Sequence, residues 1–301
     1  MARRPDGLSA YDSVVRSAGT ASPWWEWDAG TTAVHRPDFP LLGELLSIPV
    51  GGGEQSESGV FARGIDAWVA AELRRAGFGA NDVWPRATQP RVVSDDLVRA
   101  VGLLPARLRA EVWERVTAMP SVTPTDARVL GKAYEKQVDV VVSRWDRGPE
   151  VLISTKAQTS SFGKNLANRF EEAYGDAGNL RGRHPLAAVG FLFVQRSTVV
   201  TAEPDAFERT VDMMRKLRDD GAGNGYTATG LVLVEWDGNG PVVVREDLVP
   251  ADVAAGPFFE AVIGRVLSAT PVAHHVRVRE LRERRDIPVA DVDAAVRPTD
   301  Q

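Results

Sequence analysis

Asp139 and Lys156 are the two residues of this chain whose types and positions best suit a chemical reaction. The stretches 137–145 and 150–158 are rich in β-branched residues and are separated by Asp-Arg-Gly-Pro, which predicts the two strands of a β-hairpin. Asp139 falls inside the first predicted strand, and Lys156 falls near the end of the second. Because neighbouring strands lie about 5 Å apart, the carboxylate and the ammonium group are expected to share one edge of a sheet. A carboxylate that holds a divalent cation beside a lysine suits phosphodiester hydrolysis.

The composition limits the kinds of site that this chain can build. It has 301 residues, 44% of them hydrophobic, which suits one large globular domain or a core with an extra subdomain. It has no Cys and only four His, so thiolate sites are excluded and a His-rich metal site is disfavoured. A metal ion would be held by carboxylates and carbonyls, the ligands that Mg²⁺ and Mn²⁺ prefer. The net charge of −5 weakly disfavours a nucleic-acid partner, although a local basic cleft is compatible with it.

The chain is expected to be a soluble, cytoplasmic protein. It contains no apolar run of about 18 residues, the length that a membrane-spanning helix needs. Its first residues include two arginines but no apolar segment of the kind found in signal peptides.

Four regions are expected to position the two residues. Residues 1–57 form an irregular N-terminal arm with one short helix near 39–46, and residues 58–130 form a helical region that contributes one helix to the core. Residues 131–270 form the core, and 271–301 form a charged C-terminal tail. After the hairpin, the core alternates predicted helices with apolar strands in the order 164–174, 185–195, 206–218, 228–236, 241–247 and 258–267. This order predicts an α/β fold, with a mixed sheet of about five strands flanked by helices.

The hairpin and the helix after it resemble the PD-(D/E)xK superfamily of restriction-endonuclease-like nucleases. Asp139, Ser154 and Lys156 give the pattern D-x(14)-S-x-K, with Ser154 in place of the usual strand acid and Val138 in place of the usual proline. One branch of that superfamily has Ser at this position and carries its second acid on the following helix. The resemblance therefore implies a restriction-endonuclease-like core, with Glu171 or Glu172 as the second acid. Glu171 is preferred because it flanks the apolar stripe of the predicted helix, and Glu172 stays open.

The resemblance covers roughly residues 58–80 and 130–270. In the upstream helix, RGIDAWVAAELRRAGFG, it assigns an additional acid to Asp66 or Glu72, and Asp66 has the better offset from Gly77. It implies that Asp139, Asp66 and the helix glutamate hold Mg²⁺, for which Mn²⁺ is expected to substitute. Lys156 would position the attacking water, and Ser154 would support the metal shell or the phosphate.

The loop and helix after Lys156 carry residues suited to phosphate contacts. These candidate DNA-binding residues are Lys164, Asn165, Arg169, Arg181 and Arg183. The function expected from the resemblance is that of a Mg²⁺-dependent DNA endonuclease of a type II-like restriction or phage-defence system. The expected partners are double-stranded DNA, further copies of the chain in a dimer or tetramer, and a cognate methyltransferase.

Two other functions stay open. One is a catalytically inactive DNA-binding subunit of a defence or repair complex with the same fold. The other, an enzyme acting on small phosphorylated substrates, is less favoured because the sequence has no phosphate-binding loop.

Overall fold

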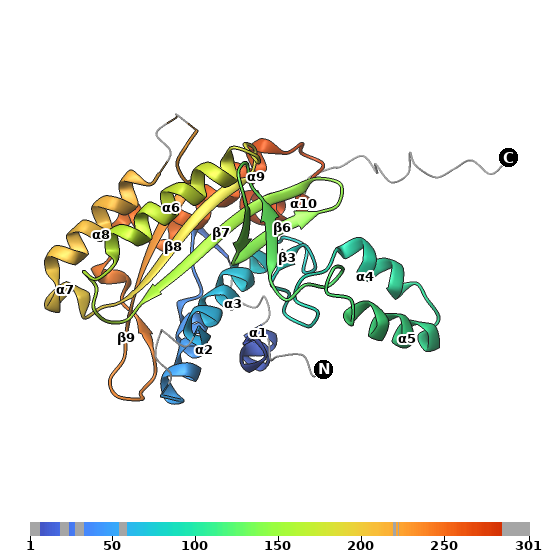
Figure 1. Cartoon of the computed structure of the whole chain (residues 1–301), viewed down its shortest axis with the longest axis horizontal. Coiled ribbons are helices and arrows are strands. Elements are labelled where there is room, and N and C mark those ends of the chain that lie inside the picture. Colours follow the sequence, from blue (N-terminus) through green and yellow to red (C-terminus); the bar gives the residue numbers. More distant parts are fainter. Residues whose placement is uncertain are drawn as a thin grey trace.

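The fold is built on a mixed six-stranded sheet with helices on both faces (Figure 1). The structure, a computed structural model, describes residues 7–18, 24–27, 33–53, 59–218, 221 and 223–284. In spatial order the strands are β10 (Val243–Val244), β9 (Ala228–Glu235), β8 (Ala188–Arg196), β7 (Gly148–Gln158), β6 (Val140–Arg144) and β3 (Val83–Trp84). Strands β7, β8 and β9 are parallel, and the other pairs are antiparallel. The predicted α/β fold with a mixed sheet is confirmed, and β3 is the strand that was not predicted.

Each face of the sheet carries its own apolar core, because successive side chains of a strand point to opposite faces. Val151 and Ile153 of β7 belong to the first core, whereas Leu152 between them belongs to the second. The helices that cover the first core are α2 (Phe39–Gly51), α3 (Val60–Arg75) and α9 (Ala255–Ala269). The second core is covered by α6 (Leu166–Arg181) and α8 (Pro204–Lys216).

The predicted helices all form, and α6 is longer than predicted. The sequence predicts a helix over 164–174, and the next residues include Gly175 and Gly178, which disfavour a helix interior. The observed α6 continues to Arg181, and Ala177 and Leu180 in its last turns are fully buried in the second core. Burial of this apolar face therefore outweighs the two glycines.

The prediction of one continuous strand over 137–145 is wrong. The chain forms two strands that belong to different sheets, β5 (Glu135–Val138) and β6, and Asp139 lies between them. Strand β5 pairs with β4 (Ala127–Leu130) in a separate hairpin, whereas β6 pairs with β7. The break arises because the two strands pair with different partners. The apolar residues on both sides of Asp139 do not reveal it.

The N-terminal stretch contributes to the first core. Strands β1 (Trp25–Trp27) and β2 (Ala33–His35) pair with each other, and the side chains of Trp24 and Trp25 are buried against the same core as α3. Residues 1–6, 19–23, 28–32 and 54–58 of the predicted arm lie outside the described residues.

The remaining elements are peripheral to the sheet. Helices α4 (Asp95–Gly102) and α5 (Ala106–Thr117) stand away from it, and α5 has no buried residue (Figure 1). Ser94 caps α4, since its hydroxyl accepts a hydrogen bond from the Asp96 N–H. The short elements are η1 (Ser9–Tyr11), α1 (Asp12–Ala18), α7 (Val199–Ala202), η3 (Glu246–Leu248), η4 (Ala251–Val253) and α10 (Val276–Glu283). Residues 285–301 of the predicted tail lie outside the described residues. None of the described helices combines the length and the apolar character that crossing a membrane would need.

Candidate active site

The candidate site lies where β7 extends beyond the end of its neighbour β6. The pairing of the two strands ends at Val140 and Ile153, while β7 continues along β8 to Gln158. Asp139 lies just before β6, and its Oδ2 accepts a hydrogen bond of 2.9 Å from the N–H of Thr155. The aspartate side chain thus binds a backbone donor at the strand edge that β6 has left open.

Thr155 also binds a second carboxylate, that of Asp66 on α3. Its Oγ1 donates a hydrogen bond of 2.6 Å to Asp66 Oδ1, and Asp66 is only 2% exposed. Thr155 lies two residues after Ile153, which belongs to the first core. Since every second side chain of a strand points to the same face, the Thr155 side chain also points toward the face that α3 covers. One residue therefore connects the carboxylates of Asp66 and Asp139, which come from separate elements.

The two carboxylates disfavour each other's ionisation. Burial, followed by the negative charge of Asp139, raises the pKa of Asp66 to about 8. Burial also raises the pKa of Asp139, and the N–H of Thr155 together with the charges of Lys156 and Arg63 offsets this only in part. Arg63 Nη1 lies 3.6 Å from Asp66 Oδ2, and its Nη2 bonds to Asp126. The positive charge of Arg63 therefore compensates part of the negative charge of the two carboxylates. A cation beside the pair would favour the ionised form of both groups.

Lys156 lies on the other face of β7, toward α6. Its Nζ is 3.4 Å from Oε1 of Glu172, and its charge lowers the pKa of Asp139. Ser154 shares this face by strand alternation. It is buried, and its Oγ has no hydrogen-bond partner in the described part of the chain.

Of the alternatives left open by the sequence, the structure brings Glu172 and Asp66 to these residues. Glu171 is exposed and makes no contact with Lys156, Asp139 or Asp66 among the described residues, so the geometry does not support the preference for it. Glu72 is fully buried and binds side chains of the protein interior instead. Its Oε2 lies 3.2 Å from His35 Nε2, and it accepts a bond of 2.6 Å from Arg75.

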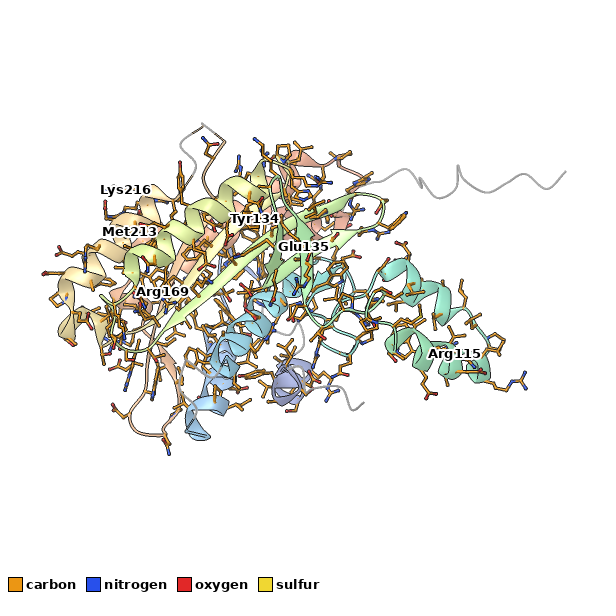
Figure 2. The ribbon with its side chains drawn as sticks, in the orientation of Figure 1. Arg115, Tyr134, Glu135, Arg169, Met213 and Lys216 are labelled. Carbon is orange, nitrogen blue, oxygen red and sulfur yellow. The ribbon has the colours of Figure 1, made fainter. Side chains whose placement is uncertain are left out.

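The candidate DNA-binding residues fall into two groups. Lys164, Asn165 and Arg169 lie at the start of α6 or just before it, whereas Arg181 and Arg183 lie at its end. A helix of 16 residues, such as α6, spans about 24 Å. Figure 2 labels Arg169 on this helix. The five residues therefore do not form one patch, and their DNA contacts stay predictions.

Sequence reasoning missed Thr155, Lys136 and Asp176. Thr155 could have been found, because strand alternation places it opposite Lys156 and thus toward the predicted helix 58–77. Lys136 Nζ lies 2.5 Å from Asp176 Oδ2 and 3.3 Å from Glu172 Oε1. These contacts join the β4–β5 hairpin, which carries Tyr134 (labelled in Figure 2), to α6. No local pattern marks these contacts, since Glu135, Lys136 and Gln137 are three polar residues in a row.

Two further observations bear on the site. Among the described residues there is no group of three or more His, Asp or Glu side chains arranged to hold a metal ion, so the site offers a pair of carboxylates rather than a triad.

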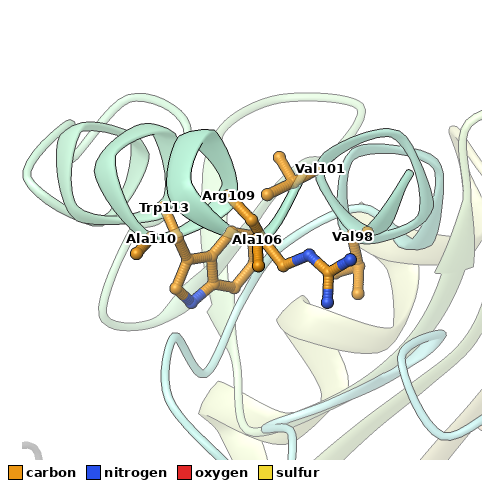
Figure 3. A pocket seen from close by; sticks show the side chains of 7 residues that line it. Val98, Val101, Ala106, Arg109, Ala110 and Trp113 are labelled. Carbon is orange, nitrogen blue, oxygen red and sulfur yellow. The ribbon is translucent and has the colours of Figure 1, made fainter. Parts of the chain in front are cut away.

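A cavity of about 510 Å³ lies between α4 and α5 (Figure 3), and none of its lining residues belongs to the site. Its lining residues are Val98, Val101, Gly102, Ala106, Arg109, Ala110 and Trp113.

Comparison with protein-family models, with curated proteins and with solved structures finds no match to this chain. The resemblance to restriction-endonuclease-like nucleases therefore rests on the motif and on the order of elements.

Proposed function

We propose that this protein is a metal-dependent nuclease that hydrolyses phosphodiester bonds in double-stranded DNA. The observation that carries the proposal is the pair of carboxylates, Asp66 and Asp139, joined through Thr155 at an open strand edge, with Lys156 as the next residue. A pair of carboxylates near a lysine is a set of groups that suits phosphodiester hydrolysis.

The donor set fits Mg²⁺, and Mn²⁺ as its substitute. Mg²⁺ is commonly held through one or two carboxylates and keeps several waters, so it does not require a third acidic side chain. Asp139 Oδ2 and Asp66 Oδ1 accept hydrogen bonds from Thr155, and Asp66 Oδ2 lies 3.6 Å from Arg63 Nη1, so a cation would bind the other Asp139 oxygen and share the Asp66 carboxylate with Arg63. A divalent cation bound there would offset the negative charge that develops on a phosphate during hydrolysis.

The residues of the chain then have separate tasks. Asp66 and Asp139 hold the cation, and Thr155 fixes the orientation of both carboxylates through its hydroxyl and its N–H. Lys156 contributes a positive charge to the phosphate and positions the attacking water. The unpartnered Oγ of Ser154 can donate a hydrogen bond to the phosphate or to that water.

One observation favours a second candidate, a DNA-binding subunit without catalysis. Residue 154 is Ser where the superfamily carries an acid, and the described site contains two carboxylates rather than three. The type II-like restriction or phage-defence role, the dimer or tetramer and the cognate methyltransferase rest on the resemblance alone and stay predictions.

Cleavage of supercoiled plasmid DNA in Mg²⁺ tests the proposal. We expect the wild-type chain to cleave, and Asp139→Asn and Lys156→Met each to lower the rate by about 100-fold or more. Asp212→Asn is the matched control, because it removes a carboxylate of α8 that is exposed and distant in sequence. Cleavage by both site variants at the rate of the control would show that the reaction occurs elsewhere. A wild-type chain that binds duplex DNA but cleaves it with neither Mg²⁺ nor Mn²⁺ would favour the binding subunit.

A further inference from the structure

On the α6 side of the open edge, two lysines from different elements share one carboxylate oxygen. The Nζ atoms of Lys136 on β5 and Lys156 on β7 lie 3.3 and 3.4 Å from Oε1 of Glu172. The two ammonium groups thus face one point, and an anion, the Glu172 carboxylate, lies between them.

Lys136 is held in place independently of Glu172. Its Nζ lies 2.5 Å from Oδ2 of Asp176, whose Oδ1 accepts a hydrogen bond of 2.9 Å from the Tyr134 hydroxyl. Asp176 is only 4% exposed, so it is a fixed partner. Burial lowers the pKa of Lys136, but the hydrogen bonds and charges of Asp176 and Glu172 together outweigh it, and the pKa lies above its ordinary value. The contact with Asp176 therefore orients Lys136 independently of Glu172.

Glu172 is the most exposed of the three residues that make these contacts. Its side chain is 49% exposed, compared with 20% for that of Lys136 and 30% for that of Lys156. Ion pairs that face water are weak and are screened by salt. The glutamate can therefore turn into solvent while Asp176 keeps Lys136 in position.

We propose that Lys136 and Lys156 form a binding site for one phosphate of the DNA backbone, and that the Glu172 carboxylate occupies this site until DNA displaces it. A phosphodiester resembles a carboxylate in carrying one negative charge shared by two oxygens, so it can take the same place between two ammonium groups. The assignment of the phosphate to DNA rests on the proposed function. Since Lys156 directly follows Thr155, this site adjoins the carboxylate pair, and Glu172 serves as a displaceable anion rather than as a metal ligand.

The first arm of the test measures the binding of a fluorescently labelled DNA duplex in EDTA, by anisotropy, over a range of salt concentrations. We expect Lys136→Met to weaken binding about three- to tenfold and to reduce the salt slope by about 0.9, the value of one phosphate contact. Lys132→Met is the matched control, because it removes the same charge from an exposed residue four positions earlier on the same hairpin. Equal binding by the two variants would overturn the site.

The second arm removes the competing anion. We expect Glu172→Gln to tighten duplex binding about two- to fivefold, which corresponds to the loss of a surface ion pair. Glu171→Gln removes the same charge from the neighbouring exposed residue and should change binding less. Because Glu172 lies on the surface, this arm also tests the site if Lys136→Met does not fold. Weaker binding by Glu172→Gln, or equal binding by both glutamine variants, would contradict displacement.

A parallel titration with inorganic phosphate separates the two sources of a phosphate group. If Lys136→Met weakens binding of the duplex but not binding of free phosphate at the same concentration, the result supports a contact with the DNA backbone. Dependence on Lys136 with free phosphate alone overturns it. All these measurements are made without a divalent metal, so a chain that never cleaves DNA would refute the proposed nuclease while the binding pattern still decides on the phosphate site.

Discussion

Thr155 shows how a single residue can assemble a site from parts that are distant in sequence. Its hydroxyl binds Asp66, which lies 89 positions earlier, and its N–H binds Asp139, 16 positions earlier. Motif reasoning found Asp66, Asp139 and Lys156 because their types and order follow a known pattern. It did not find Lys136, because the role of this residue depends on how β5 and α6 pack beside β7, and local spacing does not encode that packing. Thr155 was missed although strand alternation places it on the face opposite Lys156.

The raised pKa of Asp66 predicts a particular dependence of stability on pH. In the folded chain this pKa is about 8, above its ordinary value of 3.8, so between these values the folded state holds a proton that the unfolded state has lost. The contribution of Asp66 to stability is therefore complete below about pH 4 and is lost as the pH rises through about 8.

Urea unfolding in EDTA at pH 5, 6, 7 and 8 measures this effect. We expect the wild-type free energy of unfolding to fall relative to that of Asp66→Asn as the pH rises, by at most about 1.4 kcal/mol per pH unit. Asp212→Asn, which changes an exposed carboxylate, should show no such trend relative to the wild type. A difference between wild type and Asp66→Asn that stays constant over this range would mean that Asp66 is not buried beside a second carboxylate.

At the scale of elements, the sequence predicts those helices and strands whose own periodicity is strong. The parallel strands β8 and β9 are long apolar runs, and α3 has apolar residues at helical spacing, so both kinds of element were found. Strand β3 has only two residues and exists because it pairs with β6. The break at Asp139 is likewise set by partners, since β5 and β6 pair with different strands. Such features depend on tertiary contacts rather than on propensity.

The unexpected length of α6 leads to a prediction about its glycines. Gly175 lies inside the helix, and a Cβ added there would meet no atom within 4 Å. We expect Gly175→Ala to raise the free energy of unfolding by about 0.5–1 kcal/mol, because alanine favours the helix and restricts the unfolded chain.

The contrasting variant is Gly230→Ala on β9, where an added Cβ would lie 2.8 Å from Leu192 and 2.9 Å from Phe258. It should lower stability, since the close-packed core leaves no room for another methyl group. Thermal unfolding of both variants checks the pair, and a destabilised Gly175→Ala would contradict the helical assignment of this segment.

At the scale of the whole molecule, the N-terminal stretch and the sheet share one core. The centroid of the Trp24 ring lies 4.2 Å from that of the His35 ring, and the His35 ring in turn lies 5.0 Å from the ring of Phe259 on α9, tilted against it. The sequence predicts an irregular arm here because proline and glycine interrupt any periodicity. Composition alone does not show that Trp24 and Trp25 contact the His35 ring in this core.

This shared core predicts that Trp24 matters for the stability of the whole fold. We expect Trp24→Ala to lower the free energy of unfolding by about 3 kcal/mol, as for large-to-small changes in a core. Trp145, which is 89% exposed on the β6–β7 turn, provides the control, and Trp145→Ala should have little effect. Similar urea midpoints for the two variants would show that the N-terminal stretch is not part of the cooperative unit.

The central claim is that Asp66 and Asp139 together hold a divalent cation, and titration of the DNA-free protein with Mn²⁺ by calorimetry tests it most directly. We predict one Mn²⁺ site in the wild-type chain, weakened at least about tenfold by Asp66→Asn and by Asp139→Asn. Glu172→Gln should bind Mn²⁺ as the wild type does. A wild-type chain that binds no Mn²⁺, or a site that survives both aspartate changes and is lost in Glu172→Gln, would contradict the account.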